Sequence, residues 1–368
     1  MKVLLQARRN LLQKPGGDTN QILILKKYLK QSGVVAELSC ELEPNLQGFD
    51  LVHCFNLSRP EETVLQIRNA ATQGRKVVLH AMYQNLDEYE RRGRRGFPSE
   101  LLNKVPVRFR ELLRLLYHLG AGNLSLGRIF EFLQKGGDLA MSRALEDVTQ
   151  VVVHTELEAK AIRDCFSELM YRHIEIIPPM LDGDEFDLVH DAVPLVPFYD
   201  YFLCVGRVED LKNQLGIAKA SLNGNFFSVF AGPANYNHRH YASQLREIVR
   251  QNPDRLLWIE SPKREDILSL MAQCKAHIQA SWFETAGIAS LEALAFGKPL
   301  VCSNIGYARE IFKQHALYCD PGNLKDIEKS MFSISQVMDQ EDRICHARQM
   351  YASLLIPKVV TLYEGILK

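Results

Sequence analysis

The sequence predicts an α/β protein built from two Rossmann-like domains, each a doubly wound parallel sheet. Two observations indicate this class. Short apolar runs alternate with longer helical patterns in the first half of the chain, and the same alternation restarts after a proline-rich interruption. Alternating strands and helices favour parallel sheets with helices on both faces. The length of 368 residues agrees with two domains of roughly 150 residues each.

The first half of the chain supports this class element by element. Each expected strand is a short apolar run, and each expected helix has apolar residues spaced three or four apart. We expect strands over residues 2–7, 34–38, 51–55, 76–79, 151–154 and 174–177, and helices over residues 19–32, 61–72 and 156–166. Residues 85–135 break the alternation and carry 10 Lys and Arg against 6 Asp and Glu. They predict one or two amphipathic helices inserted into this domain.

Prolines and acidic residues between Pro178 and Tyr201 interrupt the pattern and indicate a linker. Beyond it we expect strands over residues 202–205, 226–231, 255–259, 276–280, 299–302 and 316–318, and helices over residues 213–221, 241–251, 263–273, 288–296 and 325–338. The predicted divisions are therefore residues 1–180, a linker over 181–200, residues 201–355, and residues 356–368. The last division holds a helix, Val359–Lys368, which we expect to cross back to the first domain.

The composition excludes several classes of protein. Lys plus Arg and Asp plus Glu both number 44, so no net charge attracts a polyanion, and we expect no nucleic acid partner. The 8 cysteines include no CxxC pair, so the sequence predicts no zinc site of that spacing. No run approaches the roughly 18 apolar residues of a membrane span, and the N-terminal apolar run is too short for a signal peptide. We therefore expect a cytoplasmic protein.

Two carboxylates stand out in the second half of the chain. Glu284 lies in the loop between an expected strand and an expected helix, and Glu292 lies inside that helix. Both are expected near the carboxyl end of the strand, where open α/β sheets bind ligands. The N–H groups of Ala286, Gly287 and Ile288 lie at the start of the helix and suit a phosphate.

Two cations follow the first strand of the second half. Arg207 leaves this strand and Lys212 precedes the next helix. A guanidinium can bind a phosphate through two hydrogen bonds, and an ammonium adds a point charge. Carboxylates suit sugar hydroxyls, while cations and helix N–H groups suit a diphosphate. Together they describe a site for a nucleotide-diphosphate sugar that needs no metal or other cofactor.

These residues also resemble a known family. The spacing Glu284-x7-Glu292, with Arg207 and Lys212 upstream and the segment 316–323 downstream, is similar to the retaining family 4 glycosyltransferases of the GT-B fold. That fold has two Rossmann-like domains facing a cleft. The resemblance implies a hexosyltransferase (EC 2.4) of polysaccharide biosynthesis. Such an enzyme moves a sugar from a nucleotide-diphosphate sugar to a glycan or lipid-linked acceptor held by the N-terminal domain, with retention of configuration.

The resemblance implies a role for each matching residue. Glu284 would hold hydroxyls of the donor sugar and Glu292 those of the ribose, while Arg207 and Lys212 would neutralise the departing diphosphate. His80 would lie near the anomeric carbon. Further contacts with the donor are expected from Gly16, Gly17, Thr285, Ala286, Gly287 and Ile288. The family pattern Glu-Gly-Phe-Gly is replaced here by Glu-Thr-Ala-Gly, which leaves the sugar preference open.

Other interpretations remain for these residues. Glu292 has the alternative of a structural ion pair, the Gly16-Gly17 pair that of a simple turn, and His80 that of a packed strand-end histidine. His53 also ends a strand, and packing is the simpler expectation for it. Other functions stay open: a sugar-nucleotide-binding protein without catalysis, and another enzyme of the same fold, such as a sugar-nucleotide epimerase or a phosphorylase.

The basic run Arg91–Arg95 has two interpretations, a solvated loop and a membrane contact. Anionic lipid favours each nearby Lys or Arg by about 1 kcal/mol. Residues 101–119 mix arginines with Leu, Val, Phe and Tyr, as an interfacial helix does. On the second interpretation, residues 91–114 contact an anionic membrane surface, and the protein lies on the inner face of the membrane.

Overall fold

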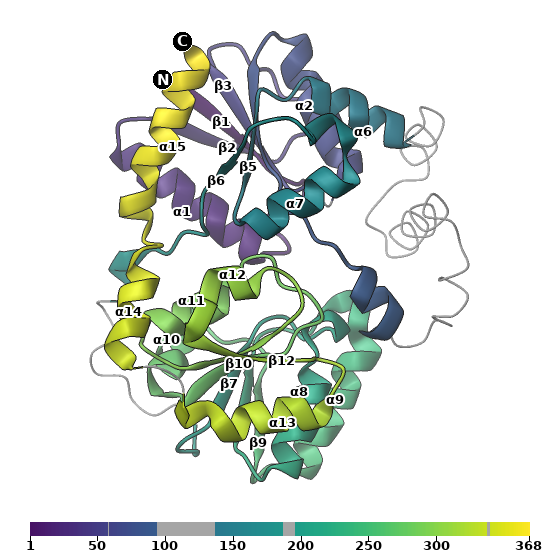
Figure 1. The fold of residues 1–368 in the computed structure, drawn as a ribbon, viewed down its shortest axis with the longest axis vertical. Coiled ribbons are helices and arrows are strands. Elements are labelled where there is room, and N and C mark those ends of the chain that lie inside the picture. The colour runs from purple at the N-terminus through teal and green to yellow at the C-terminus, as the bar shows by residue number, and fades with distance from the viewer. Residues whose placement is uncertain (58, 94–136, 187–195, 337–338) are drawn as a thin grey trace. The chain divides into compact units, whose positions relative to one another are not determined.

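The structure, a computed structural model, describes the chain apart from residues 58, 94–136, 187–195 and 337–338 (Figure 1). The described residues form two units, each with its own six-stranded parallel sheet, which confirms the predicted α/β class. Within these limits, residues 1–83, 137–181 and 352–368 form the first unit, and residues 84–93 and 182–351 form the second. Most of the helical insert expected over residues 85–135 falls outside the described residues.

The sheet of the first unit has the strand order β2-β1-β3-β4-β5-β6, and all neighbouring strands are parallel. Its strands are β1 (Lys2–Gln6), β2 (Val35–Ser39), β3 (Leu51–Phe55), β4 (Lys76–His80), β5 (Gln150–Val153) and β6 (Ile174–Ile176). The inner strands are mostly apolar because helices cover both faces of the sheet, and this is why they can be recognised in the sequence.

Helices cover each face of this sheet. α1 (Gly17–Gln31) and α15 (Ala352–Leu367) lie side by side on one face, where Tyr363 is buried (Figure 1). The other face is covered by α2 (Pro60–Thr72), α6 (Gly137–Glu146) and α7 (Glu156–Cys165). The sequence predicts no helix over the residues of α6, and the predicted last helix begins at Val359, whereas α15 begins at Ala352. Proline ordinarily marks a first helical turn, whereas Pro357 lies inside α15.

The sheet of the second unit has the strand order β12-β11-β10-β7-β8-β9, again all parallel. Its strands are β7 (Phe202–Val205), β8 (Ser228–Ala231), β9 (Leu256–Ile259), β10 (Ala276–Gln279), β11 (Leu300–Ser303) and β12 (Ala316–Cys319). Strands β8 and β9 extend the sheet on one side of β7, and β10 begins the other side. The carboxyl ends of β7 and β10 therefore flank a reversal of strand order, where such sheets bind ligands.

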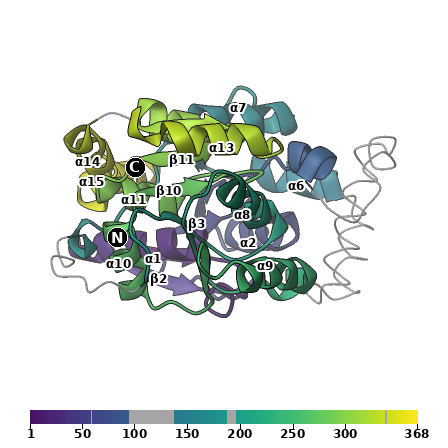
Figure 2. The same ribbon diagram turned by 90° about the horizontal axis from the view of Figure 1, so that it is seen from below.

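Helices also cover both faces of the second sheet. α8 (Gln214–Asn223), α9 (Arg239–Gln251) and α13 (Leu324–Phe332) pack on one face, with α8 beside α9 (Figure 2). The other helices are α10 (Arg264–Gln273), α11 (Ile288–Ala295), α12 (Ala308–Phe312) and α14 (Gln340–Arg348). α11 packs against β10 and contacts α10 and α14. α12 and α14 lie where the sequence predicts no helix, and α13 ends at Phe332, short of the predicted range. No described helix combines the length and the apolar content needed to cross a membrane.

Candidate functional site

The candidate site lies at the carboxyl ends of β7 and β10 in the second unit. Lys212 ends a short 3-10 turn after β7, and Glu284 lies in the loop after β10. The Nζ of Lys212 donates to Oε1 of Glu284 over 2.5 Å. The structure thus brings together two residues that the sequence analysis assigned to one site, although 71 residues separate them in the chain.

Glu284 is held from several sides. Its side chain is largely buried, and its Oε1 also accepts a hydrogen bond of 2.7 Å from Nε2 of Gln279. Its main-chain oxygen accepts from the N–H of Tyr307 over 2.9 Å, and a Cβ at Gly306 would clash with that same oxygen. Among the described residues, Oε2 has no partner. One oxygen of this fixed carboxylate is therefore left for a ligand hydroxyl.

The start of α11 offers main-chain donors beside this carboxylate. Gly287 precedes the helix with φ +57°, a left-handed conformation that favours glycine, and a Cβ there would lie 3.1 Å from the ring of Phe312. Within the described residues, no acceptor takes the N–H groups of Ala286, Gly287 or Ile288. Free N–H groups at the positive end of a helix attract an anion. Thr285 is half-buried in the same loop.

Glu292 lies on α11 and is only 3% exposed. Its Oε1 accepts a 2.7 Å hydrogen bond from Nη2 of Arg264, whose guanidinium also pairs with Glu185 over 2.5 Å. Burial lowers the pKa of Arg264, but the two carboxylates outweigh burial and raise it. The ion pair that the sequence offered as an alternative for Glu292 is therefore present, and its role toward ribose stays a prediction.

Arg207 differs from Lys212 in being exposed. It follows β7 after Gly206, and its side chain has no partner among the residues described in the structure. An unengaged guanidinium at the carboxyl edge of the sheet is free to meet an anionic ligand.

The family description Glycosyl transferases group 1 matches residues 192–347, the part of the chain that carries Arg207, Lys212, Glu284 and Glu292. Residues 192–347, called the group 1 domain below, are thus similar to this family. No curated protein sequence matches the chain.

Solved structures match the group 1 domain and the rest of the chain together. Sucrose-phosphate synthase from Thermosynechococcus elongatus has a TM-score of 0.73 at 12% identity, over 100% of this chain and 99% of that one. HepE from Anabaena, in complex with UDP and glucose, has a TM-score of 0.65 at 14% identity over 99% of both chains. A glycosyltransferase from Rickettsia africae has a TM-score of 0.66 at 15% identity, over 100% and 99%. The chain has the GT-B fold, as the sequence resemblance implied.

Several residues that build the site of the group 1 domain escape sequence reasoning. Asn213 adopts a left-handed conformation with φ +56°, and its Nδ2 donates to the main-chain oxygens of Ala280 (3.1 Å) and Pro321 (2.8 Å). It thereby joins the loops that follow β10 and β12. Gln279 was missed too, although a polar residue in a wholly buried strand is a signal that the sequence does carry.

A segment from the first half of the chain packs on the loops of the group 1 domain. Tyr89–Gly93 forms one turn of π-helix, and Arg92 donates to both carboxylate oxygens of Asp320 over 2.7 and 3.0 Å. Its guanidinium also lies 5.6 Å from the centre of the Trp282 ring. Arg91 pairs with Glu88. Two arginines of the basic run are therefore ion-paired, and the remainder of residues 91–114 beyond Gly93 lies outside the described residues.

The other predicted site residues belong to the first unit, outside the group 1 domain. Gly16 precedes α1 and its N–H donates to Oγ1 of Thr19 over 3.0 Å, while Gly17 is the first residue of the helix. The buried Arg8 pairs with Asp18 and holds the loop between β1 and α1. The glycine pair therefore lies at the start of α1, and the role of the pair toward a phosphate stays a prediction.

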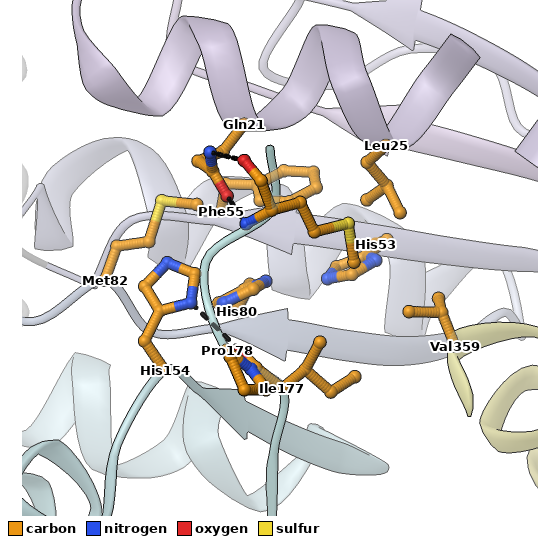
Figure 3. A pocket seen from close by; sticks show the side chains of 11 residues that line it. Gln21, Leu25, His53, Phe55, His80, Met82, His154, Ile177, Pro178 and Val359 are labelled. Carbon is orange, nitrogen blue, oxygen red and sulfur yellow. Dashed lines mark hydrogen bonds between the residues drawn. The ribbon is translucent and has the colours of Figure 1, made fainter. Parts of the chain in front are cut away.

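His80 ends β4 and belongs to a cluster of three histidines around a small pocket of the first unit (Figure 3). Its ring centre lies 4.5 Å from that of His154 and 5.8 Å from that of His53. Burial, with the two neighbouring imidazoles, lowers its pKa well below the usual value, so the ring is neutral at pH 7. His53 bonds through Nδ1 to the hydroxyl of Tyr363 over 2.5 Å, which agrees with a packing role.

Metal binding has no obvious place in the described part of the chain. There, no group of three or more His, Cys, Asp or Glu side chains is arranged to hold a metal ion.

Proposed function

We propose that this protein is a glycosyltransferase that moves a sugar from a nucleotide-diphosphate sugar to a glycan or lipid-linked acceptor. The observation that carries the proposal is the ion pair between the half-buried Lys212 and the buried Glu284, beside the free N–H groups that open α11. The pair lies in the group 1 domain. A carboxylate with one free oxygen suits a sugar hydroxyl, and a cation with helix N–H groups suits a diphosphate.

Stabilising the leaving group is the main chemical task in this reaction. As the bond to the anomeric carbon breaks, negative charge grows on the diphosphate. Arg207, Lys212 and the N–H groups of residues 286–288 would stabilise that charge, each charge-assisted contact contributing roughly 1.5–3 kcal/mol. We propose on this basis that transfer needs no metal ion.

Structures of the same fold support a nucleotide sugar as the donor. The HepE structure holds UDP and glucose, and a structure from E. coli with a TM-score of 0.62 at 13% identity is bound with UDP-2-fluoro glucose. By analogy, Glu284 would hold hydroxyls of the donor sugar, Glu292 the ribose hydroxyls, and the Gly16-Gly17 pair the phosphates. His80 would lie near the anomeric carbon as a neutral imidazole. Retention of configuration is part of the same proposal.

The acceptor side of the proposal concerns residues 91–114. Their basic character would attract the protein to the anionic inner face of a membrane, where a lipid-linked acceptor resides. Sedimentation with vesicles tests this. The protein should pellet with phosphatidylserine vesicles at low salt and not with phosphatidylcholine vesicles. Equal pelleting with both, or with neither, would contradict the membrane contact without affecting the donor assignment.

A thermal-shift panel tests the donor site first. UDP, GDP, ADP and TDP are added with and without EDTA to the wild type, to Glu292→Ala, and to the surface control Glu260→Ala. We expect one diphosphate to raise the melting temperature of the wild type and of the control, with no response to EDTA, and to lose most of its effect on Glu292→Ala. Transfer from the matching nucleotide sugar, followed by NMR of the product anomer, then tests retention. Stabilisation by no diphosphate would contradict the proposal.

A further inference from the structure

We propose that Gln279 is a positioning residue that orients the Glu284 carboxylate toward the donor sugar, and that Ser290 and His277 hold Gln279 in turn. The proposal rests on the function proposed above, because it assigns a purpose to the free oxygen of Glu284. None of these three residues touches the expected ligand directly in our assignment. They act through Glu284 alone.

A line of hydrogen bonds runs through the interior of the second unit to Glu284. The Nε2 of Gln279 donates to Oε1 of Glu284 over 2.7 Å, and Oε1 of Gln279 accepts from Oγ of Ser290 over 2.6 Å. Ser290 Oγ lies 3.1 Å from Nδ1 of His277, and the main-chain N–H of Val205 points at Nε2 of His277 over 3.4 Å. β10 supplies Gln279 and His277, and α11 supplies Ser290.

The donors and acceptors in this line have one consistent direction. The N–H of Val205 faces Nε2 of His277, so Nε2 accepts and the proton of the neutral ring is on Nδ1. Nδ1 then donates to Ser290, whose single hydroxyl proton is left for Oε1 of Gln279. With its oxygen occupied, Gln279 can only present its N–H group to Glu284. Ser290 and His277 therefore fix the orientation of the Gln279 amide before any ligand binds.

Burial keeps the imidazole at the far end neutral. His277 is completely buried, and burial together with the charge of Lys212 lowers its pKa to about 3. A second proton on Nε2 would also face the N–H of Val205. The ring therefore stays a single tautomer over the working range of pH, which fixes the direction of the whole line.

Polar side chains at these positions carry a cost that apolar residues would avoid. β10 is buried throughout, and Gln279 is only 5% exposed. A buried amide destabilises the fold unless each of its polar groups finds a partner. Both polar groups of the Gln279 amide have a partner: its N–H group donates to Glu284, and its oxygen accepts from Ser290. Since Lys212 occupies the same oxygen of Glu284, the second donor to Oε1 restrains rotation of the carboxylate and leaves Oε2 for the ligand.

Binding measurements on Gln279→Leu test the proposal. The probes are the diphosphate that binds in the panel above and its hexose ester, both measured by calorimetry. We expect the affinity for the hexose ester to fall about 10- to 100-fold, as for the loss of a hydrogen bond to a charged group, with the bare diphosphate changing less than about twofold. Gln244→Leu, an exposed glutamine of α9, is the matched control and should change neither. In the double variant Gln279→Leu/Glu284→Ala, the loss should not exceed that of Glu284→Ala alone.

The variant Gln279→Glu separates positioning from a structural role. A protonated carboxylic acid at this position can accept from Ser290 and donate to Glu284, as the amide does. An ionised one would repel Glu284. Burial and the adjacent carboxylate raise the pKa of such an acid, and the Lys212 ammonium on the same oxygen of Glu284 opposes this rise. We expect affinity for the hexose ester near that of the wild type at low pH, falling as pH rises, while affinity for the bare diphosphate follows the wild-type profile.

Three outcomes decide the matter. A selective loss of the hexose ester, with the pH profile above, supports the proposal. Equal losses of both probes in Gln279→Leu, or no loss in either, would overturn it while leaving the donor assignment in place. Binding of neither probe by the folded wild type would overturn both. If Gln279→Leu melts too low to measure, Ser290→Ala, which frees the amide to turn, should show the same selectivity to a smaller extent.

Discussion

Arg264 joins two carboxylates that lie far apart in the sequence, Glu185 at 2.5 Å and Glu292 at 2.7 Å. Their exposures differ, because 35% of the Glu185 side chain reaches solvent and only 4% of the Glu292 side chain does. The arginine therefore compensates a buried charge on one side and forms a surface ion pair on the other.

The difference in burial between Glu185 and Glu292 predicts that breaking their ion pairs with Arg264 lowers the free energy of unfolding by different amounts. Arg264→Met removes a charged partner from the buried Glu292 and should lower the free energy of unfolding by about 1.5–3 kcal/mol. Glu185→Gln breaks only the partly exposed pair and should cost less than about 1 kcal/mol. Urea denaturation of both variants at pH 7 measures the difference. Losses of the same size would show that burial does not distinguish the two pairs.

Arg207 is exposed and has no partner among the described residues, so its loss should affect catalysis and not stability. We expect Arg207→Ala to lower kcat by about 100- to 1,000-fold, as when one donor to a developing anion is removed. The free energy of unfolding should stay within about 0.5 kcal/mol of the wild type. Lys219→Ala, which removes an exposed charge from α8, is the control and should leave kcat unchanged. A kcat of the wild-type size in Arg207→Ala would remove this residue from the site.

Gly306 lies against the main chain of Glu284 and has φ +93°. In Gly306→Ala the new Cβ would clash with the Glu284 oxygen, and the left-handed backbone would be strained. We expect a loss of about 1–3 kcal/mol in the free energy of unfolding, together with weaker binding of the nucleotide sugar. Gly365→Ala is the control, because a Cβ there meets nothing within 4 Å in the exposed part of α15. It should stabilise the protein by about 0.5–1 kcal/mol. Similar effects of the two alanines would argue against the close approach.

The three buried histidines predict a pH dependence of the first unit. Burial lowers the pKa of His154 to about 4 and of His53 to about 3, and that of His80 also lies well below 6.5. In the unfolded chain each titrates near 6.5, so below this pH the unfolded state binds more protons. Stability should be complete above pH 6.5 and fall with decreasing pH, by about 1.36 kcal/mol per pH unit for each histidine.

Hydrogen exchange of β3, β4 and β5 between pH 7 and 5 measures this loss. Tryptophan fluorescence would not, since the 2 tryptophans, Trp258 and Trp282, both lie in the second unit. His80→Phe should reduce the slope by the contribution of one histidine. An unchanged slope in this variant would show that His80 does not titrate on unfolding.

The strands of both sheets were predictable because covered parallel sheets require short apolar runs, which stand out between amphipathic helices. α14 was not predictable in the same way. Its residues, Gln340–Arg348, are mostly polar, and only a few of them, such as Ala347, are buried. The start of α15 was misplaced because a proline inside a helix reads as a helix start.

Some residues of the site could likewise be predicted from the sequence, and others could not. Glu284, Lys212 and the start of α11 could be inferred because each follows a strand at the same edge of the sheet, and topology brings such positions together. The side chains that pair with the carboxylates of Glu284 and Glu292 could not be inferred from the sequence. Arg264 meets Glu292 from another helix, and Gln279 meets Ser290 across the gap between β10 and α11. Such pairs depend on side-chain geometry that spacing alone does not encode.

The position of the last helix in the chain affects how the first unit folds during synthesis. Ile356, Val359 and Tyr363 of α15 complete the apolar layer on one face of the first sheet, whose strands all lie before residue 177. During synthesis these strands leave the ribosome well before residues 352–367 do. The face of the first sheet that α15 covers therefore stays exposed while the residues of the second unit are synthesised. This interval is the period in which aggregation threatens and a chaperone would protect the chain.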